Sequence, residues 1–356
     1  MTEREAMERA LELARLGRGR VFPNPMVGAV VLAGGEPVGE GFHACCGEAH
    51  AETAALERAG GSARGSTVVV SLEPCCHASR TGPCCEALAK AGVRRVVCAM
   101  EDPDPRVSGR GIAWLREHGI EVETGLMEAE AHELNRAYIH HRTTGRSLVT
   151  IKMAMSSDGM VAAADGSSRW ITGPESRARV QEARAACDAV LVGAGTVRRD
   201  DPSFAQARTV IVVSACGLLD PRLALFRRGR ALVVAVPEGL GPVKDGLEEA
   251  GAEVWETPPA GKGLALEELL RRAADRGLGD IVCEGGPTLA GELVSSGLAD
   301  RFVFYYAPML LGAEGLPAFR GLGAGDISRA LELEISSSGV TGRDRFVEGR
   351  FVHGAR

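Results

Sequence analysis

The chain has 356 residues, which corresponds to about two domains at roughly 150 residues each. Hydrophobic residues make up 45% and charged residues 25%, as in globular proteins, so extensive disorder is excluded, and no apolar run reaches the roughly 18 residues of a membrane span. The formal net charge of −6 argues against a general nucleic-acid binder, because such proteins need a basic surface.

The first part of the chain alternates helix and strand patterns. Its N-terminal stretch is charged throughout and lacks the apolar segment of a secretory signal, whereas Met7, Ala10, Leu11 and Ala14 fall at helical spacing. We expect an amphipathic helix there, followed by a hairpin and strand–helix units, which together predict a helix-covered sheet. The expected strands are 27–33, 37–42, 67–72, 93–100 and 120–122, and the further helices are 49–58, 83–91, 111–118 and 128–138.

The clearest motif is an ordered set of metal-binding side chains: His50 and Glu52, then Cys75, then Pro83 and Cys84. One imidazole and two thiolates suit Zn²⁺ and leave a fourth position for water, as in a catalytic site. Residues two apart on a helix point in different directions, so we expect His50 at the helix entry, with Glu52 reaching back toward that water. Pro83 places Cys84 in the first turn of a helix, where the helix dipole favours a thiolate. This H-x-E…P-C…C order is typical of zinc nucleobase deaminases, although eight residues separate the two cysteines here.

Three other interpretations of these residues stay open. Cys76, Cys85 or His77 could supply a fourth ligand and close a purely structural zinc site, which would leave Glu52 without a purpose. The chain could be a deaminase of bases in DNA or RNA with an accessory second half. It could also be a zinc-stabilised scaffold without activity.

A polar stretch from His140 to Arg146 marks the expected domain boundary, so we expect domains over residues 1–145 and 146–356. In the second domain the expected strands are 148–155, 189–192, 210–213, 232–236, 281–283 and 301–306, and the expected helices are 174–186 and 289–296. Two strands run into glycine-containing turns, 193–196 and 284–288. Because glycine permits close backbone approach and helix-start amides favour phosphate, two such turns predict a phosphate-bearing ligand, with ordinary βα turns as the alternative.

Longer motifs in both halves resemble the bifunctional riboflavin-biosynthesis deaminase–reductase family, RibD (also called RibG). In the first half the resemblance is carried by residues 72–85, with their long insert between the two cysteines, and by Pro23-Asn24-Pro25, His43 and Asp102-Pro103. In the second half it is carried by segments 152–159, 168–172, 188–193 and 284–289. The resemblance covers nearly the whole chain.

For the first domain the resemblance implies a cytidine-deaminase-like, three-layer α/β fold that deaminates a phosphoribosylaminopyrimidine. It implies Zn²⁺ held by His50, Cys75 and Cys84, and Glu52 as the proton shuttle. The implied substrate contacts are Asn24, His43, His77, Arg80, Asp102 and Asp104. Asp104 stands where the family commonly has Asn. Arg80 in a loop beside the metal suits a ribose phosphate, with a solvated loop charge as the alternative.

For the second domain the resemblance implies a dihydrofolate-reductase-like α/β fold that uses NADPH to open the ribose and reduce it to a ribityl chain. The implied cofactor contacts are Ala154, Trp170, Thr196, Asp200, Ser214, Gly286, Pro287, Thr288 and Leu289, and the implied substrate contacts are Ser168, Arg184, Phe204, Arg208 and Glu284. Hydride delivery to a ribose carbon needs an open aldehyde or imine and a proton donor. Lys152, Asp200 and Glu284 are the candidates for this role. The loop after Asp201 is shorter than in the family, which bears on Phe204 and Arg208.

These observations together predict a cytoplasmic α/β enzyme that uses Zn²⁺ and NADPH on a small-molecule substrate. We expect no nucleic-acid or membrane partner and a homo-oligomeric state.

Overall fold

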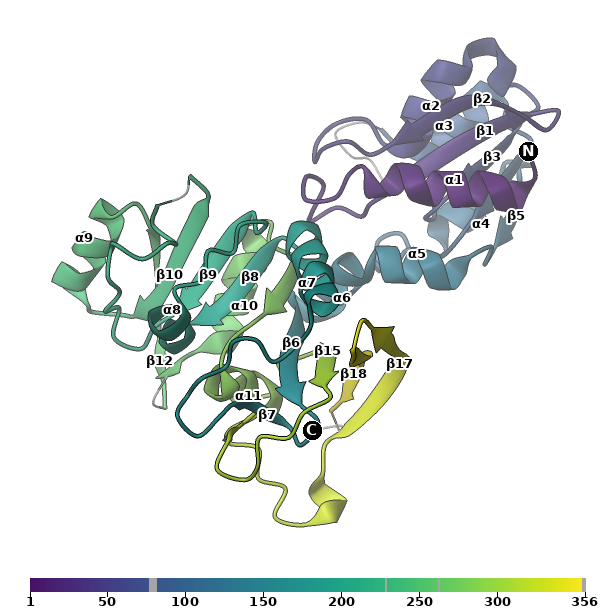
Figure 1. Ribbon diagram of the computed structural model, residues 1–356. Coiled ribbons are helices and arrows are strands. Elements are labelled where there is room, and N and C mark those ends of the chain that lie inside the picture. The colour runs from purple at the N-terminus through teal and green to yellow at the C-terminus, as the bar shows by residue number, and fades with distance from the viewer. Residues whose placement is uncertain (77–81, 228, 262, 354–356) are drawn as a thin grey trace. The chain divides into compact units, whose positions relative to one another are not determined.

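The computed structural model describes residues 1–76, 82–227, 229–261 and 263–353. The chain divides into two compact units, Met1–Gly145 and Arg146–Arg356 (Figure 1). Within the described ranges, we find no helix with the length and apolarity that a membrane crossing requires.

The first unit is built on a five-stranded sheet with the order β2-β1-β3-β4-β5. Its strands are β1 (Gly28–Ala33), β2 (Glu36–Phe42), β3 (Thr67–Val70), β4 (Arg95–Cys98) and β5 (Glu121–Thr124). β1 is antiparallel to β2 and β3, whereas β3, β4 and β5 run parallel. The expected hairpin is β1–β2, and the expected edge strand is β5. The central strands are runs of buried valines, because helices cover both faces of this sheet.

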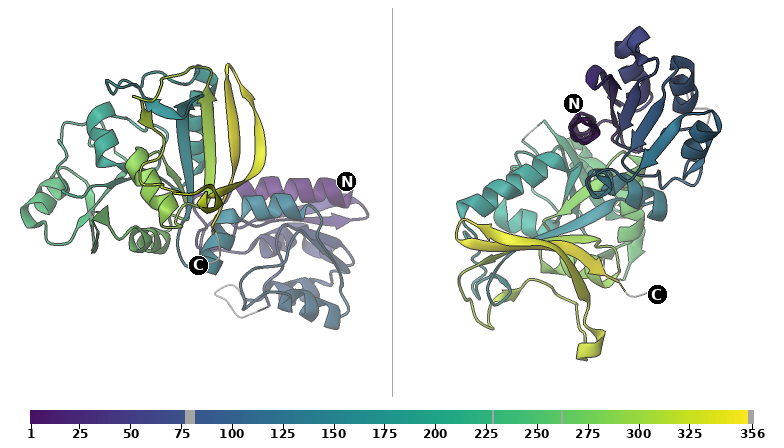
Figure 2. Two further views of the ribbon diagram at one scale, coloured as in Figure 1. Left: turned by 90° about the horizontal axis from the view of Figure 1, so that it is seen from below. Right: turned by 90° about the vertical axis from the view of Figure 1, so that its right-hand side faces the viewer.

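Helices on the two faces of the sheet give the first unit three layers, as expected (Figure 2). They are α1 (Glu3–Arg15), α2 (Ala51–Ala59), α3 (Cys84–Ala91), α4 (Arg110–Glu117), α5 (Glu128–Leu134) and α6 (Arg136–Thr144), with a 3₁₀ turn over Gly60–Ala63. Residues of α1 and α5 pack on one face and residues of α2, α3 and α4 on the other. α1 lies very close to β1, since a Cβ built on Gly28 would stand 2.0 Å from the carbonyl oxygen of Ala10.

The polar stretch that was expected to mark the domain boundary is largely helical. The helix expected over 128–138 is two helices, α5 and α6, and α6 continues through the polar residues to Thr144. Asn135 stands between them and exchanges hydrogen bonds with the backbone of Met26 at 2.8 and 3.0 Å. Gly145 ends α6 in the left-handed conformation at φ 73°, which glycine adopts at little cost.

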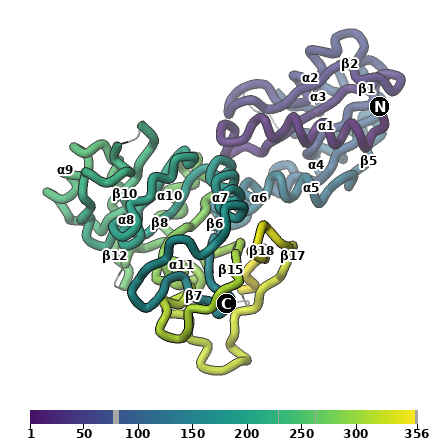
Figure 3. The backbone as a smooth tube through the Cα atoms, in the orientation of Figure 1, coloured from purple at the N-terminus to yellow at the C-terminus, as the bar shows by residue number. Residues whose placement is uncertain are grey.

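The second unit is built on a nine-stranded sheet with the order β11-β10-β9-β8-β14-β6-β15-β18-β17. The first seven strands in this order are parallel, and β18 and β17 are antiparallel additions at one edge. The strands are β6 (Leu148–Ser156), β8 (Ala189–Gly193), β9 (Thr209–Val213), β10 (Ala231–Pro237), β11 (Glu253–Thr257), β14 (Asp280–Cys283), β15 (Arg301–Ala307), β17 (Glu332–Thr341) and β18 (Asp344–Val352). Figure 3 follows the C-terminal backbone through β17 and β18.

Helices and small strand pairs complete the second unit. They are α7 (Pro174–Ala186), α8 (Ala194–Asp200), α9 (Gly241–Glu249), α10 (Leu266–Asp275) and α11 (Pro287–Ser295), the strands β7 (Met160–Ala162), β12 (Pro259–Ala260), β13 (Gly263–Leu264) and β16 (Leu316–Pro317), and a 3₁₀ turn over Ile327–Arg329. α10 and α11 pack on one face of the large sheet, and residues of α8 and α9 pack on the other. The result is a largely parallel α/β sheet with helices on both sides.

Candidate functional site

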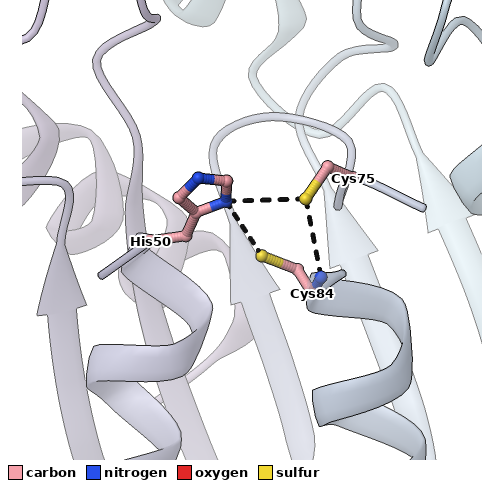
Figure 4. Close-up of side chains that lie close together, drawn as sticks. All are labelled: His50, Cys75 and Cys84. Atoms are coloured by element: carbon pink, nitrogen blue, oxygen red, sulfur yellow. Dashed lines mark hydrogen bonds between the residues drawn. The ribbon is translucent and has the colours of Figure 1, made fainter. Parts of the chain in front are cut away.

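Three potential metal ligands of the first unit converge as expected from their order in the sequence. His50 is the N-cap of α2, Cys84 is the first residue of α3, and Cys75 lies in the loop after β3. The Nδ1 atom of His50 is 3.2 Å from Cys84 Sγ and 3.5 Å from Cys75 Sγ, and the three atoms lie within 4.8 Å of one another (Figure 4). One nitrogen and two sulfurs around a common point match the ligand types of zinc.

The two sulfurs are arranged to keep one thiolate at neutral pH. The contact with Cys84 lowers the pKa of Cys75 to about 4, and His50 and the backbone N–H of Cys84 act in the same direction. The contact with Cys75 and burial raise the pKa of Cys84. Since a metal ion binds thiolates rather than thiols, this cluster is prepared to bind one with release of the remaining proton.

Glu52 lies in the first turn of α2 beside the cluster, with 3% of its surface exposed. Burial raises the pKa of Glu52 to about 7, and the neighbouring Cys75 thiolate adds to this effect. A cation held by the three ligands would lower that pKa again. A carboxyl group that titrates near neutrality and is not a ligand has the properties of a general acid and base.

The described residues do not form a structural zinc site with four protein ligands. The cluster found among them contains three side chains. Cys85 is buried, and its Sγ donates to the carbonyl oxygens of Pro74 at 3.3 Å and Gly111 at 3.6 Å. Cys76 packs against the apolar core of the first unit. His77, the remaining candidate for a fourth ligand, lies outside the described residues, and so does Arg80.

The cluster opens onto a cavity of about 320 Å³. Four substrate contacts expected from the sequence line it, namely Asn24, His43, Asp102 and Asp104. It is also lined by residues that the sequence analysis missed, including Cys46, Glu48, Glu73, Arg106, Tyr138 and Arg142. These belong to other parts of the chain, and nothing in their local sequence pattern connects them with the zinc motif.

His43 and Asn24 form one wall of this cavity. The Nδ1–H of His43 donates to the carbonyl oxygen of Ala49 at 3.2 Å, which leaves its Nε2 to accept from Asn24 Nδ2 at 3.2 Å. The His43 ring stands edge-on to His50 at a centroid distance of 5.5 Å. Burial lowers the pKa of His43, so the ring is neutral at pH 7 and its tautomer is set by these two bonds.

The wall formed by the segment after β4 and by α6 carries charged groups. Asp102 accepts from Tyr138 Oη at 2.7 Å and from the backbone N–H of Asp104 at 2.9 Å, and burial raises its pKa. The Asp104 carboxylate pairs with Arg106, whose guanidinium lowers the pKa of Asp104 to about 2. Arg142 Nε lies 3.6 Å from the same carboxylate.

The second unit holds a larger cavity of about 590 Å³ at the carboxyl ends of its central strands. Expected site residues that line it are Lys152, Ala154, Ser168, Trp170, Arg184, Thr196, Asp200, Phe204, Glu284, Gly286 and Pro287. Arg169, Arg177 and Arg199 also line it and were not predicted. Arg177 lies 4.5 Å from the ring centroid of Trp170, which is 66% exposed.

A buried carboxylate organises two cations in this cavity. Arg184 donates to Glu284 through Nε at 2.5 Å and Nη2 at 2.8 Å, and Lys152 Nζ lies 3.6 Å from Glu284 Oε2. Burial lowers the pKa of Lys152, which the Glu284 charge opposes. The guanidinium of Arg184 also lies 4.9 Å from the ring centroid of Phe204. Lys152 is therefore a partly buried lysine in a cavity, not a solvated surface residue.

The two glycine-containing turns meet in space, because β8 and β14 are neighbours in the sheet. A Cβ built on Gly286 would stand 3.2 Å from Thr196 Oγ1, and one built on Gly285 would stand 2.8 Å from Leu289 Cδ2. Gly286 is the N-cap of α11. At these turns the backbone can closely approach a ligand in the cavity, next to the N-terminus of α11. This arrangement fits a phosphate-bearing cofactor.

Four expected contacts do not line this cavity. Arg208 directly precedes β9, and its charge acts on Asp188, which directly precedes β8. Both therefore lie at the amino ends of parallel strands, whereas the cavity lies at the carboxyl ends. Ser214 is buried and accepts from the N–H of Gly217 at 3.0 Å. Thr288 and Leu289 belong to α11, and Leu289 packs in the core.

Comparison with known proteins gives consistent matches over both units. Residues 147–346 match the family described as the RibD C-terminal domain, and residues 1–100 match the cytidine and deoxycytidylate deaminase zinc-binding region. The chain is 41% identical to the riboflavin biosynthesis protein RibD of Escherichia coli over 342 residues, which is 90% of this chain and 92% of that protein.

Solved structures show the same similarity. RibD of Acinetobacter baumannii aligns with a TM-score of 0.85 at 33% identity and covers 99% of both chains. The diaminohydroxyphosphoribosylaminopyrimidine deaminase/5-amino-6-(5-phosphoribosylamino)uracil reductase of Thermotoga maritima aligns with a TM-score of 0.84 at 33% identity, covering 98% of this chain and 99% of that one.

Proposed function

This chain belongs to the RibD family of riboflavin-biosynthesis enzymes, and from that premise we propose which residues carry its two reactions. The protein is a bifunctional enzyme, a zinc-dependent deaminase and an NADPH-dependent reductase. We assign the deaminase to residues 1–145 and the reductase to residues 146–356. The assignment is supported by the two compact units and by the different cavities within them.

In the deaminase unit, His50, Cys75 and Cys84 hold the zinc ion. Zinc supplies Lewis-acid activation of a water molecule when it is bound. Glu52 takes a proton from the attacking water and delivers protons to the leaving nitrogen, so that the ring amino group departs as ammonia and a carbonyl group replaces it. The observation that carries this proposal is the convergence of the three ligands beside a buried carboxyl group at the wall of a cavity.

Asn24, His43, Asp102 and Asp104 bind the substrate in that cavity. His43 and Asn24 present a chain of hydrogen bonds whose direction the neutral histidine sets. Asp102 and Asp104 offer acceptors for ring amino groups. The substrate is the phosphoribosylaminopyrimidine that the family deaminates, and His77 and Arg80 remain expected contacts for it.

In the reductase unit, NADPH would supply, when bound, the hydride for conversion of the ribosyl group into a ribityl chain. We assign proton donation to the opened sugar oxygen to Lys152 and Asp200, which both line the cavity, and Glu284 holds Lys152 and Arg184 in position. Ala154, Trp170, Thr196, Gly286 and Pro287 contact the cofactor. Ser168, Arg184 and Phe204 contact the substrate. Ser214, Thr288, Leu289 and Arg208 remain expectations from the family resemblance.

One assay tests both halves of this proposal. Purified protein with its zinc content measured is given the diaminopyrimidinone substrate, and ammonia release and NADPH consumption are followed separately. We expect Glu52→Gln to retain zinc and to lose ammonia release by roughly 10²- to 10⁴-fold. The same variant should still oxidise NADPH when the deaminated ribosyl compound is supplied. Full ammonia release by Glu52→Gln would contradict the assigned proton shuttle.

We also propose that the enzyme works in the cytoplasm as a homo-oligomer on its small-molecule substrate, without nucleic acid. The edge strand β17 supports self-association, because it pairs on one side only and carries exposed apolar residues, with Ile335 at 60% and Val340 at 63% exposure. Light scattering measures the state directly. Ile335→Lys should shift it toward the monomer, whereas a monomeric wild-type protein would refute this part.

A further inference from the structure

Two arginines at the wall of the deaminase cavity are held by a single carboxylate. Arg106 binds Asp104 in a fork, with Nε 3.0 Å from Oδ1 and Nη2 2.5 Å from Oδ2. Arg142 comes from α6 and places Nε 3.6 Å from Asp104 Oδ2. All three side chains line the cavity that contains the zinc ligands.

The remainder of this cavity is acidic. Glu48, Glu52, Glu73 and Asp102 line it, and among its lining residues in the described part of the chain Arg106 and Arg142 are the sole arginines, with no lysine. Among these described lining residues, the attraction for an anionic group is therefore concentrated at Arg106 and Arg142. Because the guanidinium of Arg106 keeps the pKa of Asp104 near 2, Asp104 stays ionised, and the three groups together carry one net positive charge.

The two guanidiniums are held firmly and still have donors to offer. Arg142 lies 5.1 Å from the ring centroid of Tyr138, whose hydroxyl is bound to Asp102, and its Nη2 donates to the carbonyl oxygen of Pro23 at 3.3 Å. The side chains of Arg106 and Arg142 are 65% and 24% exposed. Arg142 Nε is buried and has no hydrogen-bond partner in the described part of the chain, and most of the Arg106 side chain is exposed, so both guanidiniums have N–H groups available for a ligand.

We propose that Arg106 and Arg142 bind the phosphate group of the deaminase substrate and that Asp104 orients them. The inference rests on the proposed deaminase function, since it concerns the phosphorylated end of the molecule whose ring lies at the zinc site. Planar guanidiniums match phosphate oxygens in pairs of charge-assisted hydrogen bonds. The aspartate at position 104 therefore has a role beyond contact with the ring, because it carries the charge that orients both cations.

Kinetics with two substrates separate phosphate binding from every other effect. Arg106→Gln and Arg142→Gln are compared with the matched control Arg15→Gln, which alters an exposed arginine at the end of α1. Ammonia release is measured on the phosphorylated substrate and on its dephosphorylated counterpart. Each cavity variant should raise KM for the phosphorylated substrate by roughly 10- to 100-fold, with kcat within about twofold, and leave KM for the dephosphorylated compound unchanged.

Three results overturn the proposal. One is an unchanged preference for the phosphorylated substrate in both variants, which would leave Arg80 as the phosphate ligand. Another is an equal loss on both substrates, which would indicate a structural role. The third is a comparable loss in Arg15→Gln. Zinc content and circular dichroism confirm that the variants are folded.

Direct binding distinguishes failure of this inference from failure of the proposed function. Ribose 5-phosphate is titrated calorimetrically into the full-length, zinc-loaded chain without NADPH, so that no deamination is required. The double variant should lose a binding event that the wild-type protein and Arg15→Gln both show, while any binding in the second unit stays the same in all three. If the double variant loses the binding event but the wild-type protein releases no ammonia from the substrate, the phosphate site is supported and the deaminase assignment is refuted. Identical isotherms would refute the phosphate site.

Discussion

Replacing Glu284 by Gln tests the organisation of the reductase cavity, because it removes one charge from a buried cluster while preserving its volume. The side chain of Glu284 is 7% exposed, and those of Arg184 and Lys152 are 17% and 19% exposed. Breaking a buried ion pair costs about 3–5 kcal/mol. Gln keeps an acceptor for one of the two bonds from Arg184, so we expect the lower end, about 3 kcal/mol.

This loss of stability and its chemical consequence are measured separately. For a unit of this size a loss of about 3 kcal/mol corresponds to a fall of roughly 6–12 °C in the melting temperature, which calorimetry of the wild-type protein, Glu284→Gln and the exposed control Glu249→Gln detects. Burial and Arg184 lower the pKa of Lys152, and the Glu284 charge opposes both. Without that charge the pKa of Lys152 falls further. The falling, high-pH limb of the NADPH oxidation profile should therefore move to lower pH, while ammonia release stays unchanged.

The reasoning is refuted if Glu284→Gln melts within about 2 °C of the control and keeps the wild-type profile of NADPH oxidation. It is also refuted if ammonia release falls in parallel, because the deaminase cavity is built entirely from residues of the other unit.

Three further changes have expected outcomes. Removal of zinc by a chelator should abolish ammonia release but leave the oxidation of NADPH that accompanies reduction of the deaminated compound. Equal loss of both activities would contradict separate sites. Gly28→Ala places a methyl group 2.0 Å from the carbonyl oxygen of Ala10 and should destabilise the first unit by roughly 1–3 kcal/mol or more. In the control Gly61→Ala the added methyl group meets nothing within 4 Å, so thermal unfolding should show a lower melting temperature for Gly28→Ala only. Burial raises the pKa of Asp188 to about 6, above its unfolded value, so its favourable contribution to stability is present at pH 4 and is lost as the pH rises through 6. Denaturant unfolding should then show Asp188→Asn gaining up to about 3 kcal/mol relative to the wild-type protein between pH 4 and pH 7.5, and a constant difference would contradict the assigned pKa.

The placement of His50 and Cys84 at helix starts was predictable because each is tied to a local signal. A histidine before a helical stretch becomes the N-cap of α2, and a cysteine after Pro83 begins α3. Both placements depend on helix-start chemistry that a short window contains. The hairpin β1–β2 was predictable for the same reason, since Gly34 and Gly35 interrupt an alternating apolar run.

The residues that the sequence analysis missed share no local signal with the motif. Arg142 lies in the polar stretch that was expected to mark the domain boundary, and Tyr138 is the last residue of the helix expected over 128–138. Both belong to α6, whose start is tied to the backbone of Met26 by Asn135. This contact spans more than a hundred residues, so no periodicity indicates it. β17 and α10 are different, because each carries a local signal that was overlooked. Glu332, Leu333, Glu334 and Ile335 alternate polar and apolar residues at the start of β17, and the spacing of Leu266, Leu269, Leu270 and Ala273 predicts a helix.

The two cavities share one electrostatic arrangement, although they lie in units of different topology. In each, one carboxylate with little exposed surface holds two cations: Asp104 holds Arg106 and Arg142, and Glu284 holds Arg184 and Lys152. A carboxylate so placed cancels part of the attraction for an anionic substrate, which by itself weakens binding. The ion pair offsets this loss because it orders the cations before the ligand binds. Long cationic side chains lose about 2 kcal/mol of rotamer freedom when a ligand orders them, and an ion pair formed on folding has already removed much of that freedom. Cations oriented in this way suit an enzyme that must place one phosphorylated molecule accurately twice, once for loss of an amino group and once for hydride transfer.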